Sequence, residues 1–130
     1  MPESNLTSVV GVLPVTDHVK AVTWSQKWIG RAPDVEPMEG VAEWQLAENA
    51  WIQVAVDPES AGRSTVVVGV KDIDAQRSAC AAADVVVGDV NDYGFVKTAE
   101  AVDPAGNRLM SDNATDSDFL RGSRPRSEIL

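Results

Sequence analysis

One stretch decides the fold of this chain: Thr65-Val66-Val67-Val68-Gly69-Val70-Lys71-Asp72. Its β-branched run is long enough for a strand and too short for a buried helix, and the final aspartate can cap the helix-compatible sequence that follows. The same pattern occurs in Val10-Gly11-Val12-Leu13-Pro14-Val15-Thr16-Asp17, and the two aspartates are 55 residues apart. An internal repeat of this length usually indicates two copies of one supersecondary unit.

Length and composition predict one globular domain. The chain has 130 residues, of which 44% are hydrophobic, enough for an ordinary core. We expect this domain to occupy residues 1–115, with a polar tail at 113–130. Residues 1–8 lack the pattern of a signal peptide, and no apolar stretch approaches the roughly 20 residues that span a bilayer. We therefore expect a cytoplasmic protein that does not enter a membrane.

The charge balance and the cysteine count restrict the possible partners and chemistry. Twenty acidic and eleven basic residues give a net charge of −9, which repels phosphate backbones and permits neutral or cationic ligands. We therefore expect no nucleic-acid partner. The single cysteine, Cys80, cannot form an intramolecular disulfide, and its alanine-rich surroundings favour a small buried residue over a nucleophile.

The first half of the chain predicts a strand, a helix and three further strands. Apolar residues at helical spacing, Trp24 and Trp28 among them, predict a helix over 17–29 that packs on a sheet and ends at Gly30. A strand at 34–38 follows Pro33 and contains Pro37, so it can only lie at an edge. Strands at 41–47 and 50–56 form a hairpin.

The register of this hairpin decides which side chains share a face. With Ala47 opposite Ala50, Leu46 pairs with Trp51 and Trp44 pairs with Gln53. Two tryptophans and an amide then lie on one face of the sheet. The other face takes the pairs Gln45 with Ile52 and Glu43 with Val54.

The second half repeats the order after a polar linker at 57–63. We expect a helix from Ile73 to about Ala83, strands at 85–90 and 94–101, a turn at 103–107 and a last strand from Arg108. The segment from Ser111 to Leu130 is polar, and we expect it to be a tail that is either mobile or packed only through Phe119 and Leu120.

Several of these motifs together resemble a known family. They are Val15-Thr16-Asp17, Ala21, Trp24, Ile29-Gly30, Val70-Lys71-Asp72 and Asp103-Pro104-Ala105-Gly106-Asn107. In combination they are similar to the glyoxalase/bleomycin-resistance/dioxygenase family, the vicinal oxygen chelate superfamily, over residues 8–110. The resemblance implies an α+β fold of two βαβββ modules, at about 8–57 and 64–112, whose mixed sheets form a half-open cup with helices outside and a ligand cleft inside.

The resemblance also implies where a divalent metal would bind, and this chain departs from the pattern there. The corresponding positions hold Val10, Gln53, Thr65 and Met110 in place of the family's His and Glu. Valine has no donor atom, and methionine suits softer ions. The only histidine, His18, is expected on the outer surface of the first helix, so a Ser-His-Asp or Cys-His set is not expected in the cleft. Paired carboxylates, for example Glu43 with Glu100, stay formally possible, but no spacing favours them. We expect no metal, no cofactor and no catalytic residues.

The predicted cleft is aromatic and apolar with a few polar groups. Strand alternation and the family geometry place nine residues in it: Trp44, Trp51, Gln53, Val10, Val12, Thr65, Val67, Arg108 and Met110. Such a surface suits a planar small molecule, and the acidic chain favours a cationic one. The tryptophans alternatively only fill the sheet face.

Three functional interpretations remain open. The first is a metal-independent small-molecule binder that resembles the bleomycin-resistance proteins, which sequester an antibiotic. The second is a lyase, isomerase or oxygenase of the same superfamily with an unidentified substrate. The third is an accessory domain with a vestigial cleft. Because each module presents sheet edges that need covering, we also expect a homodimer.

Overall fold

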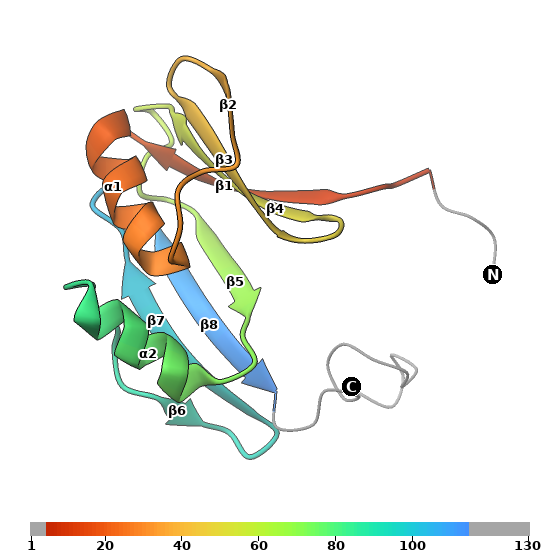
Figure 1. Cartoon of the computed structure of the whole chain (residues 1–130), viewed down its shortest axis with the longest axis vertical. Coiled ribbons are helices and arrows are strands. Elements are labelled where there is room, and N and C mark those ends of the chain that lie inside the picture. The colour runs from red at the N-terminus through yellow and green to blue at the C-terminus, as the bar shows by residue number, and fades with distance from the viewer. Residues whose placement is uncertain (1–4, 115–130) are drawn as a thin grey trace. The chain divides into compact units, whose positions relative to one another are not determined.

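The computed structural model describes residues 5–114, which form two βαβββ modules (Figure 1). The first contains β1 (Val9–Val15), α1 (His18–Ile29), β2 (Val35–Met38), β3 (Val41–Ala47) and β4 (Ala50–Val56). The second contains β5 (Thr65–Gly69), α2 (Ile73–Ala82), β6 (Asn91–Asp92), β7 (Val96–Val102) and β8 (Arg108–Ala114). This α+β arrangement confirms the predicted fold class. Neither of the two helices is long and apolar enough to span a membrane.

Contacts divide the described chain into two compact units. One contains residues 5–66 together with 102–108, and the other contains residues 67–101 together with 109–114. The first sheet has the strand order β1-β4-β3-β2, and the second has the order β5-β8-β7-β6. Strand β2 lies at an edge, as its proline required.

Both helices begin and end where local sequence predicted. The Asp17 carboxylate accepts a hydrogen bond from Lys20 N at 3.1 Å, and the Asp72 carboxylate accepts bonds from two backbone N–H groups of α2. Gly30 takes the left-handed conformation, with φ of 100°, and its N–H donates to Gln26 O. These caps satisfy backbone groups that a helix end otherwise leaves without partners.

One face of the first sheet forms the core of the first module. Two rows of paired residues run across β1, β4 and β3 on this face: Gly11, Ile52 and Trp44 in one, and Leu13, Val54 and Ala42 in the other. All of these except Gly11 are buried. Helix α1 contacts β4 and buries Ala21, Ser25 and Trp28, while Trp24 is half-buried.

The hairpin has the predicted strands but a different register. Ala47 does lie opposite Ala50, yet a bulge at Leu46 shifts the rest of β3 by one residue. Trp44 therefore pairs with Ile52, and Glu43 pairs with Gln53. The predicted pairs of Leu46 with Trp51 and Trp44 with Gln53 are wrong. The regular register would have placed Glu43 and Gln45 against the core residues of β4, and burying a charge without a partner is costly.

The second module is built in the same way around the second sheet. Ile73 N, at the start of α2, donates to Asn113 Oδ1 on β8 at 3.1 Å. Leu109 and Ser111 on β8 are buried, as is Cys80 on α2. Burial raises the pKa of the Cys80 thiol, which agrees with the prediction of a buried structural residue.

Two predicted elements in this module are wrong. Residues 85–90 do not form a strand, because Asp84, just after α2, has φ of 63° and the next residue, Val85, is buried with its N–H bound to Cys80 O. Gly88 N in this segment donates to Glu100 O on β7 without forming a strand. The predicted tail also begins too early, since Ser111–Ala114 belong to β8. Phe119 and Leu120 lie outside the described residues.

A buried polar network fixes the turn at 103–107. The Asn107 side chain is fully buried and donates through Nδ2 to Pro14 O at 2.7 Å and to Asp103 Oδ2 at 2.9 Å. Its Oδ1 accepts from Ser64 N at 3.1 Å. Asp103 Oδ1 in turn accepts from the N–H groups of Ala105 and Asn107. The turn is thereby bound to the end of β1 and to the start of β5.

Candidate functional site

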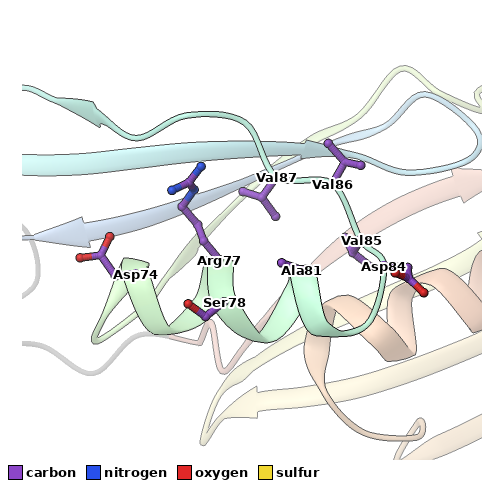
Figure 2. Close-up of a pocket in the computed structure, with 8 residues that line it drawn as sticks. All are labelled: Asp74, Arg77, Ser78, Ala81, Asp84, Val85, Val86 and Val87. Carbon is purple, nitrogen blue, oxygen red and sulfur yellow. The ribbon is translucent and has the colours of Figure 1, made fainter.

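A hollow of about 590 Å³ lies between the outer face of α2 and the segment that follows the helix (Figure 2). Arg77 Nε donates to Gly88 O at 3.0 Å and fixes the segment to the helix. Eight residues line the hollow: Asp74, Arg77, Ser78, Ala81, Asp84, Val85, Val86 and Val87. None of them is aromatic, and none belongs to the predicted site, whose residues lie on the strands.

The open face of the first sheet carries four of the predicted site residues. Two rows cross β1, β4 and β3 on this face: Val10, Trp51 and Gln45 in one, and Val12, Gln53 and Glu43 in the other. Paired residues on neighbouring strands point to the same side of a sheet, so the six side chains form one surface. Val10 and Val12 are 42% and 40% exposed, and Trp51 is half-buried. We call these six residues the open face.

Polar side chains on the open face make hydrogen bonds within the hairpin. Gln53 Nε2 donates to Glu43 Oε2 at 2.5 Å across the β3–β4 pair. Gln45 Nε2 donates to Glu48 O in the hairpin turn at 2.9 Å. The face therefore offers an indole ring and two valines beside an amide and a carboxylate held in fixed positions.

Trp44, which we predicted to share this face, lies on the opposite face. It is fully buried in the core row with Ile52, and its Nε1 donates to Arg31 O at 2.9 Å. The reason is the bulge at Leu46, which allows the large apolar ring to be buried while Glu43 and Gln45 remain accessible. Trp44 is accordingly a packing residue of the first module.

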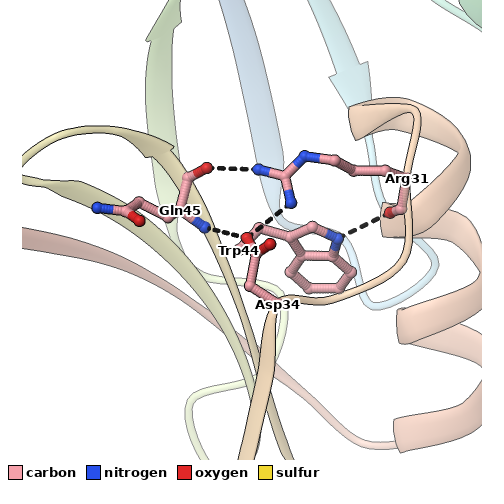
Figure 3. Close-up of polar contacts among 4 residues, drawn as sticks. All are labelled: Arg31, Asp34, Trp44 and Gln45. Carbon is pink, nitrogen blue, oxygen red and sulfur yellow. Dashed lines mark hydrogen bonds and ion pairs between the residues drawn. The ribbon is translucent and has the colours of Figure 1, made fainter.

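A set of polar contacts holds the loop after α1 against β3 (Figure 3). Asp34 Oδ2 accepts from Arg31 Nη1 at 2.6 Å and from Gln45 N at 2.7 Å, and Arg31 Nη2 donates to Gln45 O. Hydrogen bonds from Arg31 and from the Gln45 backbone lower the pKa of the Asp34 carboxyl. Because both backbone groups of Gln45 are used here, the contacts fix the residue that immediately precedes the bulge.

The other predicted site residues belong to the second sheet. Arg108 and Met110 alternate with the buried Leu109 and Ser111 along β8, so they lie on the less buried face of that sheet. On β5, Thr65 and Val67 are both exposed. Their part in a binding site stays a prediction.

The residues that could act as metal ligands are the acidic side chains, Cys80 and His18. Among residues 5–114, no three His, Cys, Asp or Glu side chains lie close enough together to hold a metal ion. His18 is on the first turn of α1, as predicted, and its Nε2 lies 3.8 Å from Glu36 Oε1. Val10 and Gln53 are on the open face, where Gln53 Nε2 bonds to Glu43.

Comparisons with known proteins test the family resemblance. No protein-family model matches the sequence, and no curated protein matches it either. Among solved structures, the chain is similar to a glyoxalase/bleomycin resistance protein from Catenulispora acidiphila. The two are 25% identical with a TM-score of 0.79, and the match covers 84% of this chain and 99% of that one.

Two further structures are named for the molecules that they bind. TnmS3, an antibiotic binding protein from Streptomyces sp. CB03234, is 17% identical with a TM-score of 0.72, over 88% of this chain and 99% of that one. A bleomycin-binding protein from Streptomyces verticillus, complexed with copper(II)-bleomycin, is 18% identical with a TM-score of 0.70, over 88% and 100%. This chain therefore has the fold of the glyoxalase/bleomycin-resistance proteins, the vicinal oxygen chelate fold, as the resemblance predicted.

Proposed function

We propose that this protein binds a planar, cationic small molecule on the open face of its first sheet and sequesters it without chemical change. The observation that carries the proposal is the row Val10, Trp51 and Gln45, in which a half-buried indole lies between an exposed valine and an amide. Aromatic walls with a few fixed polar groups suit flat ligands. The net charge of −9 favours cations.

The structural comparisons support a binding role. Two of the matched structures are an antibiotic binding protein and a bleomycin-binding protein, so other chains with this fold bind small molecules. The proposed binding is metal-independent, because Val10 has no donor atom and the amide of Gln53 is bonded to Glu43. Thr65, Val67, Arg108 and Met110 lie on the second sheet, and their role in ligand binding stays a separate prediction.

The test is a screen of heteroaromatic and cationic compounds, bleomycin included, for saturable quenching of tryptophan emission. With a compound that binds, Trp51→Ala should raise the dissociation constant roughly thirtyfold, since an aromatic anchor commonly contributes about 2 kcal/mol. Trp51→Phe keeps an aromatic wall and should bind much more tightly than the alanine variant. Equal affinity of folded Trp51→Ala and wild type would show that the indole only packs.

The same screen distinguishes sequestration from catalysis. A sequestering protein returns the compound unchanged at a fixed stoichiometry, whereas an enzyme of this superfamily would convert it. Adding Zn, Ni, Mn or Fe separately should leave both the affinity and the melting temperature unchanged. A metal bound at 100 times its dissociation constant would stabilise the fold by about 2.7 kcal/mol, which is a visible shift.

We also propose that two copies of the chain form a homodimer. Strands β1 and β5 each lie at an edge of their sheet, and Val9 on β1 is 71% exposed. Edge strands with exposed apolar residues commonly need a covering partner. Light scattering at micromolar concentration should give twice the chain mass of 13.9 kDa. A mass equal to one chain would contradict the proposal.

A further inference from the structure

We infer that Glu43 is the residue that makes the open face select cations, and that the preferred ligand is a planar aromatic cation. The inference rests on the proposed function and names the group that recognises the charge. The regular hairpin register predicted Glu43 on the face opposite Trp51 and Gln53, outside the expected site. The bulge at Leu46 instead brings it into the row with Val12 and Gln53.

The Glu43 carboxylate is partly buried and has no cationic partner among residues 5–114. Glu43 is half-buried, and its Oε2 accepts a hydrogen bond from Gln53 Nε2 at 2.5 Å. Ion pairs form at Asp34, Glu36 and Asp89, whereas no lysine or arginine among residues 5–114 pairs with Glu43. A carboxylate that is partly removed from water without a cationic partner is unfavourable, and a bound cation would relieve that cost.

Trp51 lies close to Glu43 on the open face. It lies opposite Gln45, two residues from Glu43 along β3, so Trp51 and Glu43 are diagonal neighbours on one face. Diagonal neighbours are roughly 7–8 Å apart, within the combined reach of an aromatic and a long side chain. An indole face attracts cations through its quadrupole, so the ring and the carboxylate can hold the same charged group from two sides.

The open face combines one available carboxylate oxygen with an apolar surface. The amide of Gln53 fixes one carboxylate oxygen, and the other, Oε1, makes no hydrogen bond with the rest of the described chain. Val10 and Val12 extend the face as an apolar surface beside the polar groups. A flat ring that carries its positive charge within the ring system satisfies all of these groups at once, whereas a compact inorganic cation leaves the apolar surface exposed.

The test compares two probes of nearly equal size on the full-length chain. N-methylacridinium is a planar cation, and acridine is its neutral counterpart at a pH where the ring nitrogen is unprotonated. Isothermal calorimetry with the wild type should show about tenfold tighter binding of the cation, the size expected for one charged contact. Glu43→Gln keeps the size of the side chain and should remove this preference while leaving acridine binding within about twofold.

The matched control is Glu48→Gln in the exposed turn between β3 and β4, which changes the net charge by the same amount. It should retain the preference for the cation. If both variants lose the preference for the cation equally, the effect belongs to the overall charge. If Glu43→Gln loses affinity equally for both probes, the effect belongs to packing. Either result overturns the inference. If the wild type binds both probes equally tightly, Glu43 has no such role, yet the proposed binding of planar molecules stands.

Discussion

Replacement of Trp44 by alanine should lower the free energy of unfolding by about 3–5 kcal/mol, the range for removal of a fully buried large aromatic side chain. The ring is 0% exposed and fills the centre of the first module's core beside Ile52. The change also removes the hydrogen bond from Nε1 to Arg31 O. The total free energy of unfolding of a domain is about 5–15 kcal/mol, so the variant should be only marginally stable.

Urea denaturation followed by far-ultraviolet circular dichroism measures this effect without depending on indole fluorescence. Trp51→Ala is the matched control, because it removes the same side chain from the half-buried open face and should cost clearly less. Trp44→Phe should fall between the two, since it keeps most of the apolar volume but not the N–H donor. If Trp44→Ala and Trp51→Ala lose equal stability, the assignment of the two faces is wrong.

Replacement of Asn107 by alanine should be similarly destabilising, by about 3 kcal/mol or more. The side chain donates to Pro14 O and to Asp103 and accepts from Ser64 N, so its removal leaves several buried groups without partners. Each buried polar group that loses its hydrogen bond costs roughly 1–3 kcal/mol. A large decrease in melting temperature should follow, whereas Asn91→Ala on the exposed β6 should change it little.

Asn107→Asp sharpens this test. It keeps the size of the side chain but replaces the donating amide by a carboxylate next to Asp103, so two like charges would meet in a buried site. We expect this variant to be at least as unstable as the alanine variant at neutral pH, and to recover partly in mild acid. Wild-type stability of both variants would show that the network does not hold the turn.

The elements that sequence predicted correctly are those fixed by local interactions. A capping aspartate and a glycine that can take positive φ act within a few residues of the helix they delimit, so Asp17, Gly30 and Asp72 could be identified without knowledge of the rest of the chain. The strands of the hairpin were likewise bounded by their turn. These features are sufficient to establish the βαβββ order.

The register of the hairpin could not be obtained from the turn alone. It depends on which faces of β3 and β4 the core requires, and only the bulge at Leu46 matches apolar Trp44 with Ile52 and polar Glu43 with Gln53. That signal is present in the sequence, because both strands alternate apolar and polar residues. Comparing the two alternations before fixing the turn would have identified Trp44 as core and Glu43 as part of the open face.

The strand predicted at 85–90 is wrong for a different reason, which the sequence does not reveal. Its valines have high strand propensity, but propensity describes how a residue fits a sheet and does not supply a neighbouring strand. In the structure Val85 is used to fill the core below α2, and pairing with β7 begins only at Asn91 and Asp92. The burial of Val85 depends on tertiary contacts, so the local sequence pattern could not predict it.

The parallel pairing of β1 with β4 determines when the first module can form during synthesis. Hairpin β3–β4 joins neighbouring segments, but Val9 pairs with Ala50, so β1 must wait until about 40 further residues have been made. The bond from Asn107 to Pro14 O comes later still, across 93 positions. A growing chain therefore holds Leu13 and its neighbours without their final contacts until these later residues have been made, and non-local pairing of this kind folds slowly. The nascent chain, more than the finished protein, is the form exposed to aggregation and to chaperones.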